Sequence, residues 1–142
     1  MDTLDKNLLE LLLENSRLSI TELAKRLNVT RATVQEHIRR LERNQIIQGY
    51  TVRLHPEYAQ RQVCANVLIA ADQKKLSQVS RQIEQIKAVQ SLHSISGQYD
   101  LCAQVQDEST ETLDQQIDKI ISIDGIERTQ TSIYLSRKFD RS

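Results

Sequence analysis

The feature that most constrains the fold of this chain is a pair of helical segments near its N-terminus, separated by only a few residues. In the stretch SITE, the hydroxyl of Ser19 and the carboxylate of Glu22 can cap the free amides at the start of a helix. Asn28, a residue that tolerates a left-handed backbone, ends this helix after barely two turns, and Thr30 can cap the next one. Two helices joined by so tight a turn predict a helix-turn-helix, whose second helix enters the major groove of DNA.

Apolar residues at helical spacing support three helices in this region. The first helix can be capped by Asp2 or Thr3 and suits an end at Asn15. The inward-facing positions of the three helices are, in order, Leu4, Leu8, Leu11 and Leu12; Ile20, Leu23, Ala24 and Leu27; and Val34, Ile38 and Leu41. Together they predict a small helical domain with a shared apolar core.

Positive charge is concentrated around the third of these helices. The whole chain balances 19 lysines and arginines against 19 aspartates and glutamates, yet residues 25–53 hold seven basic residues and two acidic ones. At about 100° per residue, most of the arginines lie on the face opposite Val34. A basic stripe on a neutral chain is expected where one part of a protein meets a polyanion, and a solvated helix face is the alternative.

We predict that this basic face contacts double-stranded DNA. Residues near the start of the helix are placed to reach base edges, and those farther along are placed for phosphates. The first group is Arg31, Thr33, Gln35 and Glu36, and the second is Arg39, Arg40 and Arg43.

The helical pattern stops after Arg43. The stretch IIQGYTVRL, residues 46–54, has Gly49 as a turn or bulge followed by β-favouring residues, which predicts a short wing or linker strand. The polar stretch HPEYAQR, residues 55–61, contains the single proline and predicts a linker. The expected organisation is a DNA-binding domain at 1–54, a linker at 55–61 and a second domain at 62–142.

Residues 62–142 show strand and helix patterns in the order βαββαβ. The expected strands cover residues 63–70, 89–95, 99–105 and 127–135, and Ser109 can cap the second of the two helices. This order predicts an α+β fold with an antiparallel ferredoxin-like sheet and both helices on one face. The other face holds enough Val, Ile and Leu to favour burial against another subunit, which predicts an obligate oligomer.

The stretch SGQYD, residues 96–100, lies between the two middle strands. From the residues alone it predicts a two-residue hairpin, in which Gly97 and Gln98 form a type II′ turn.

Other classes of site find little support in the sequence. Cys64 and Cys102 lie inside apolar, strand-like stretches, which favours small core residues over a disulfide or a metal site. The three histidines are scattered, so we expect neither a metal nor a cofactor. The apolar runs are too short to span a bilayer and no basic segment precedes an apolar one at the N-terminus, so we expect a cytoplasmic chain with no membrane partner.

Over nearly its whole length the chain resembles the leucine-responsive regulator/AsnC family of transcription regulators, also called feast/famine regulatory proteins. The resemblance rests on LSITELAKRLNV, HIRRLE and QGY in this order and spacing, followed by a βαββαβ domain with SGQYD at its central hairpin. It implies a winged helix-turn-helix joined to a ligand-sensing domain, dimers assembled into octamers, and amino-acid effectors.

The resemblance also implies an effector site between dimers at the SGQYD hairpin. Its exposed amides would take the carboxylate of an amino acid and Asp100 its ammonium group, with Gly97 and Tyr99 shaping the site and Gln98 setting specificity. Thr131 and Ser132, from the last strand, are weaker candidates, because alternating threonine also simply suits a strand.

Two alternatives to an effector-responsive regulator remain. One is an architectural DNA-binding protein without an effector, which a search for amino acids that shift the melting temperature would distinguish. The other is an enzyme, since haem-precursor decarboxylases have similar domains. Its only support is His93 and Tyr99, which form no paired catalytic constellation. The sequence is therefore expected to encode a regulator rather than an enzyme.

Overall fold

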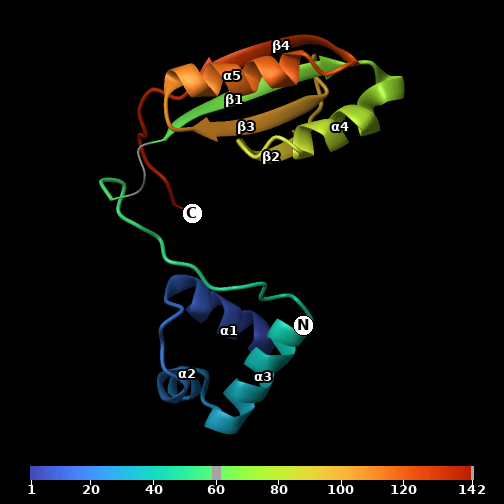
Figure 1. Cartoon of the computed structure of the whole chain (residues 1–142). Helices are drawn as coiled ribbons and strands as arrows, with labels where there is room; N and C mark the ends of the chain where they lie inside the picture. Colours follow the sequence, from blue (N-terminus) through green and yellow to red (C-terminus); the bar gives the residue numbers. More distant parts are fainter. Residues whose placement is uncertain (59–61, 142) are drawn as a thin grey trace. The chain divides into compact units, whose positions relative to one another are not determined.

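The computed structural model describes residues 1–58 and 62–141 and divides the chain into two compact units (Figure 1). The first unit is Met1–Leu54 and the second begins at His55. The boundary coincides with the predicted end of the first domain. Residues 55–58 of the predicted linker form a turn, in which the Tyr58 N–H donates to the His55 carbonyl at 2.8 Å, whereas residues 59–61 lie outside the described residues.

The first unit contains three helices, α1 (Thr3–Glu14), α2 (Ile20–Leu27) and α3 (Arg31–Arg43). Asp2 caps α1 in a reciprocal box with Asp5, and Asn15 follows the end of the helix as predicted. The helices share a core whose fully buried members are Leu8, Leu23, Val34 and Leu41. Each such side chain contributes roughly 1.5–3 kcal/mol when it leaves water, so apolar burial holds the unit together.

The capping box predicted for α2 is only half formed. The Glu22 N–H donates to the Ser19 hydroxyl at 3.0 Å, as expected. The Glu22 carboxylate, however, accepts from the Arg26 Nε at 3.0 Å instead of returning to Ser19. A charged donor one turn along the helix is the stronger partner, because hydrogen bonds between ionised groups exceed those to a neutral amide.

The wing strand predicted within residues 46–54 is wrong for this structure. Between α3 and the first strand of the second unit, the described residues contain no strand. Tyr50, Val52 and Leu54 are all exposed. A strand needs a partner for its backbone N–H and C=O groups, and the first unit has no second strand to supply one.

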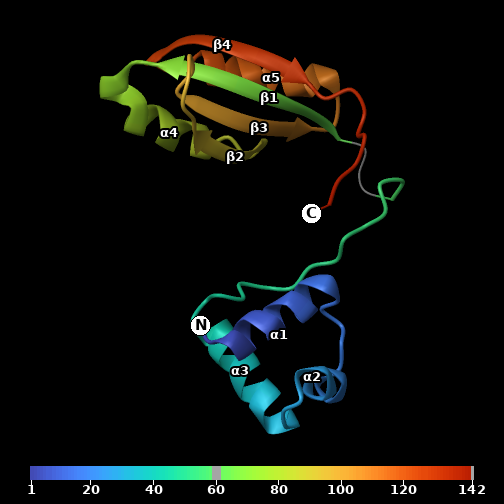
Figure 2. The same ribbon diagram turned by 180° about the vertical axis from the view of Figure 1, so that it is seen from behind.

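The second unit is a four-stranded antiparallel sheet in the order β2-β3-β1-β4, with α4 and α5 on one side (Figures 1 and 2). This is the predicted ferredoxin-like arrangement. Its elements are β1 (Val63–Ala71), the 3-10 helix η1 (Gln73–Lys75), α4 (Leu76–Glu84), β2 (Val89–Ser94), β3 (Leu101–Asp107), α5 (Thr110–Ile121) and β4 (Ile126–Ile133). As predicted, Ser109 caps α5.

The core of this unit lies between the sheet and the two helices. Alternate residues of β1 and β3, such as Val67, Ile69 and Ala103, are buried against Ile83 of α4 and Ile120 of α5. Side chains in a strand alternate between the two faces, so this inward set leaves every second residue on the open face of the sheet.

The expectation that the open face is rich in Val, Ile and Leu is wrong. Its members in β1 and β3 are polar or small apart from Leu68, and all but Ala70 are half-buried or exposed: Cys64, Asn66, Leu68, Ala70, Cys102, Gln104 and Gln106. All other branched apolar residues of both strands have the opposite parity and face the helices. Among the described residues, no helix is long and apolar enough to cross a membrane.

Candidate functional site

The turn between α2 and α3 is fixed by backbone geometry. Asn28 has φ 55° and ψ 47°, the left-handed conformation predicted for it. The Val29 N–H donates to the Ala24 carbonyl at 3.0 Å, which closes the last turn of α2. The Thr30 hydroxyl then accepts from the Thr33 N–H at 3.1 Å and starts α3. The predicted helix-turn-helix is therefore present, and hydrogen bonds from backbone amides define both the end of α2 and the start of α3.

The outer face of α3 is basic and open to solvent. Five of the seven predicted DNA-contacting residues are exposed: Arg31, Gln35, Glu36, Arg39 and Arg43. The three arginines in this set form no ion pair among the residues that the structure describes. Thr33 is half-buried and its hydroxyl lies 2.8 Å from that of Thr30, so it is partly committed to the helix cap.

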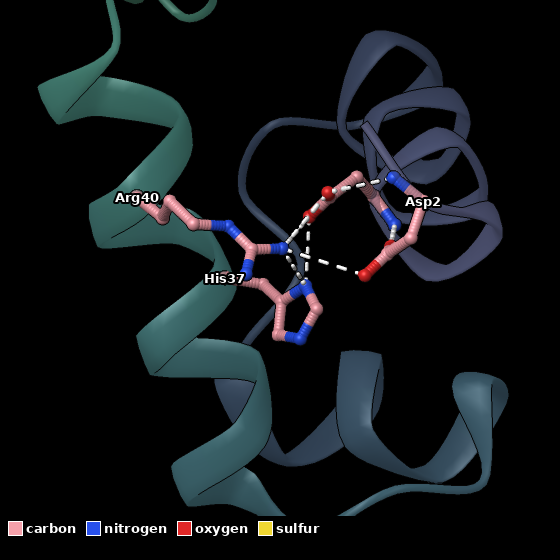
Figure 3. Close-up of polar contacts among 4 residues, drawn as sticks. Asp2, His37 and Arg40 are labelled. Carbon is pink, nitrogen blue, oxygen red and sulfur yellow. Dashed lines mark hydrogen bonds and ion pairs between the residues drawn. The ribbon is translucent and has the colours of Figure 1, made fainter.

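The Arg40 side chain reaches towards α1 (Figure 3), which corrects its predicted place on the outer face of α3. Its Nη2 donates to both carboxylate oxygens of Asp5, at 3.1 Å and 2.9 Å, and lies 3.5 Å from Asp2. Helical periodicity predicts Arg40 on the outer half of α3, but a long side chain at the flank can turn either way. A buried carboxylate on α1 draws it inward.

Asp5 is the centre of this arrangement and is almost fully buried. Burial raises the pKa of its carboxyl, but hydrogen bonds from His37, from the Asp2 amide and from Arg40, together with the positive charge of Arg40, outweigh burial. They lower the pKa of Asp5 from its usual 3.8 to about 2. The carboxylate is therefore ionised at neutral pH.

Asp2, Asp5 and His37 bring three potential metal ligands within 4.8 Å of one another, the one such group among the described residues. The Arg40 Nη2 lies among these ligand atoms, 3.1 Å from His37 Nδ1 and 2.9 Å from the nearer Asp5 oxygen. A guanidinium already neutralises the carboxylates, so the arrangement suits an internal ion pair better than a metal ion.

The second candidate site is the loop between β2 and β3. The strands end at Ser94 and resume at Leu101, so the predicted two-residue turn is wrong and residues 95–100 form a wider loop. Gly97 has φ 118°, left-handed as expected for a glycine but far from the roughly +60° of a type II′ turn. The loop widens because its last residues bind other strands.

Contacts to β4 hold the middle of this loop over the sheet (Figure 2). The Tyr99 hydroxyl donates to Gln130 Oε1 at 3.2 Å, and Arg128 donates to the Gln98 carbonyl at 2.9 Å. The guanidinium carbon of Arg128 also lies 5.0 Å from the centre of the Tyr99 ring. Gly97 and Gln98 stay exposed at the outer end of the loop.

Asp100 is used by the fold itself, which the sequence did not indicate. Its carboxylate accepts from the Ala71 N–H and from Gln73 Nε2, both at 2.9 Å, and its own N–H donates to the Ile69 carbonyl at 2.8 Å. The residue predicted to bind an ammonium group thus first anchors the loop to the end of β1.

The two β4 candidates lie on opposite faces of the sheet. Thr131 faces the helix side, where it lines a groove of about 590 Å³ with Ile133 and α5. Ser132 has the other parity and faces the open side, as do Arg128 and Gln130. The structure therefore does not bring Thr131 and Ser132 together with each other.

Sequence reasoning missed Arg128, Gln130 and the Asp5–His37–Arg40 cluster. For Asp5 a signal was available, because it falls on the inward stripe of α1, one turn before Leu8. An aspartate at such a position requires a partner. For Arg128 and Gln130 no such signal exists, since their contacts depend on the path of a loop far away in the sequence.

A helix-turn-helix unit with an exposed basic helix, joined to a ferredoxin-like sheet domain, defines a class of DNA-binding regulators. Comparison with known proteins identifies the family within that class. The model of the Lrp/AsnC ligand binding domain matches residues 64–142, and a model of winged helix-turn-helix DNA-binding domains matches residues 1–48. The chain belongs to the Lrp/AsnC family of HTH-type transcriptional regulators.

Individual relatives agree over the whole length. An uncharacterized HTH-type transcriptional regulator of Pyrococcus furiosus is 36% identical over 135 residues, which cover 95% of this chain and 91% of the relative. The structure of AsnC from E. coli matches with a TM-score of 0.87 at 27% identity, covering 100% and 97% of the two chains. A feast or famine regulatory protein from M. tuberculosis, complexed with L-methionine, matches with a TM-score of 0.83 at 28% identity, covering 98% and 95%.

Proposed function

We propose that this regulator contacts DNA through the outer face of α3 and that an amino acid bound at residues 95–100 changes this contact. The single observation that carries the first part is the outer face of α3, where Arg39 and Arg43 are exposed and form no ion pair with any described residue. Unpaired guanidinium groups at a helix surface are available for phosphates.

The roles within α3 follow from position along the helix. Arg31, Gln35 and Glu36 lie in its first two turns and are proposed to address base edges, with Thr33 a weaker participant because its hydroxyl serves the cap. Arg39 and Arg43 are proposed to bind phosphates.

The effector proposal is supported by the family match and by the loop. The match covers a ligand binding domain, and the M. tuberculosis relative was solved with L-methionine. Gly97 and Gln98 offer exposed backbone amides for a carboxylate. Tyr99 and Ser132 lie on the same side of the sheet, and Asp100 shapes the loop while keeping further lone pairs for an ammonium group. Thr131 faces the other side and would contribute only indirectly.

We further propose that the chain acts as a homodimer that assembles to higher order, up to an octamer, in the cytoplasm where its DNA lies. An interface along the edge strand β4 is supported by the exposed apolar residues at its end and just beyond it, which are Ile133, Tyr134 and Leu135. Its relatives are transcriptional regulators, and we propose no catalytic role for this chain.

The test combines two measurements on the full chain. Selection from a random DNA pool yields the preferred duplex, and the affinity for that duplex is measured with each of the twenty amino acids present. The expected result is that at least one amino acid both raises the melting temperature and alters DNA affinity at constant protein concentration. If the chain prefers one DNA sequence but no amino acid alters its affinity for that sequence, the result would favour an architectural DNA-binding protein without an effector.

A further inference from the structure

Asp5 is the single buried charged side chain among the described residues, with 2% of its surface exposed. Burying a carboxylate is costly, and apolar residues of similar size often pack as well. The helical unit already has an apolar core, so the burial of this charge calls for a separate explanation.

The contacts of Asp5 join α1 to two points on α3, His37 and Arg40, which lie about one helical turn apart. His37 Nδ1 lies 2.7 Å from Asp5 Oδ1, and Arg40 Nη2 lies 2.9 Å from Asp5 Oδ2. The short distance to a carboxylate oxygen means that Nδ1 carries a hydrogen and donates it. The same atom then cannot accept from Arg40, so the two donors share Asp5 and do not bind each other.

Directional bonds at two points restrict a helix in a way that apolar packing does not. Val34, Ile38 and Leu41 hold α3 against the core, but apolar contacts are non-directional and tolerate small rotations and slides. Bonds from positions 37 and 40 to one carboxylate fix both the rotation of α3 about its axis and its height along α1. Arg39, next to Arg40, is thereby aimed outward.

We propose that Asp5 is a positioning residue for DNA recognition: with His37 and Arg40 it forms a clamp, defined by these three residues, that sets the orientation of α3. Arg40 acts inside this clamp and does not contact phosphate. The inference rests on the proposed DNA interface of α3, and the experiment below separates the two.

The experiment measures the affinity of full-length variants for a fluorescein-labelled duplex, selected from a random pool with the wild-type chain, as a function of salt concentration. Asp5→Asn and Arg40→Ala are each expected to weaken binding about tenfold while leaving the salt slope unchanged, because no phosphate contact is lost. Arg39→Ala, the matched control on the outer face, is expected to reduce the slope by about one unit.

A double-mutant cycle tests whether Asp5 and Arg40 act together. The double variant is expected to bind no more weakly than either single variant, whereas Asp5→Asn and Arg39→Ala should combine additively. Arg40→Lys, which keeps a cation for Asp5, is expected to recover most of the affinity lost in Arg40→Ala. Circular dichroism well below the melting temperature confirms that each variant is folded, and His37→Gln replaces Asp5→Asn if the latter is not.

The outcomes are distinct. A salt slope for Arg40→Ala that falls as it does for Arg39→Ala would place Arg40 on a phosphate and overturn the clamp. Wild-type affinity in folded Asp5→Asn and His37→Gln would also overturn it. Unchanged affinity and slope in both Arg39→Ala and Arg43→Ala would instead refute the proposed interface, and the role of the clamp with it.

Discussion

At the scale of single residues, Asp100 anchors the last residue of the loop at 95–100 to the end of β1. Its carboxylate satisfies the Ala71 N–H and Gln73 Nε2. We predict that Asp100→Ala destabilises the second unit by about 1–3 kcal/mol, because the backbone N–H loses a charged acceptor. Urea unfolding followed by circular dichroism measures this.

Gln73→Ala is the control for this prediction, since it removes the exposed half of the interaction and keeps the bond to Ala71. Gln73→Ala should lower the free energy of unfolding clearly less than Asp100→Ala does. Equal stabilities of Asp100→Ala and the wild type would show that the carboxylate does not hold the loop.

Gln45 is a second residue whose backbone determines an outcome. It follows α3 with φ 58°, and the Ile46 N–H donates to the Leu41 carbonyl at 2.9 Å, the closing bond of a left-handed helix end. A left-handed backbone destabilises a residue that carries a Cβ by roughly 1–2 kcal/mol. Glycine avoids this strain but loses more backbone entropy on folding, which offsets part of the gain in stability. We predict that Gln45→Gly stabilises the first unit by about 0.5–1 kcal/mol.

The comparison for this change is Asn28→Gly, at the left-handed end of α2. Asparagine already tolerates that conformation, so Asn28→Gly should stabilise the first unit much less than Gln45→Gly does. Thermal unfolding of both variants checks the order, and a larger gain at Asn28 than at Gln45 would contradict it.

At the scale of elements, the packing of α1 on α3 should depend on pH through Asp5. The folded pKa of about 2 lies below the usual 3.8, so the carboxylate contributes stability that is fully present above pH 3.8. This contribution is lost as the pH falls from 3.8 towards 2. We predict that the wild-type chain loses more stability across this window than Asp5→Asn does.

Urea midpoints at pH 5, 4, 3 and 2 for both chains test this prediction. The difference between them isolates Asp5, because the other carboxyl groups are common to both. Parallel pH profiles for the two chains would show that the ion pair adds nothing to stability.

The elements themselves were largely predictable from the sequence. The strongest local signals, the caps at Ser19, Thr30 and Ser109, predicted helix starts correctly because a cap involves residues only a few positions apart. Strand periodicity likewise predicted the order βαββαβ. The wing strand failed because a strand also needs a partner, which local sequence does not report.

The candidate sites were less predictable because they depend on distant contacts. Arg40 and Asp100 were assigned to ligands by their position on a helix or in a loop, yet each binds a residue about thirty positions away. A charged side chain takes the strongest partner that the fold places within its reach. Only the fold shows that Asp5 and the Ala71 amide are those partners.

At the scale of the whole molecule, the division into two units predicts where assembly occurs. The second unit has its own core, and the exposed residues Ile133, Tyr134 and Leu135 belong to it. We predict that residues 62–142 expressed alone form oligomers of the same order as the full chain. Light scattering at several concentrations measures this, and a stable monomer at micromolar concentration would contradict it.

Substitutions at the end of the edge strand β4 and just beyond it test the assembly prediction further. Leu135→Asp and Ile133→Asp introduce charge where an interface is expected, and should shift the fragment towards smaller species without unfolding it. Leu13 is 86% exposed but lies in the first unit, so Leu13→Asp should leave the oligomeric state of the full chain unchanged.

The reactivity of the two thiols on the open face of the sheet can report whether another subunit covers that face. Cys64 and Cys102 are free, are half-buried and lie on the same face of adjacent strands. Their alkylation rates would report whether that face is covered, without any added label. Contact over the face would slow both thiols together, whereas contact at the β4 edge would leave both reactive, so a timed exposure to iodoacetamide distinguishes the two modes of assembly.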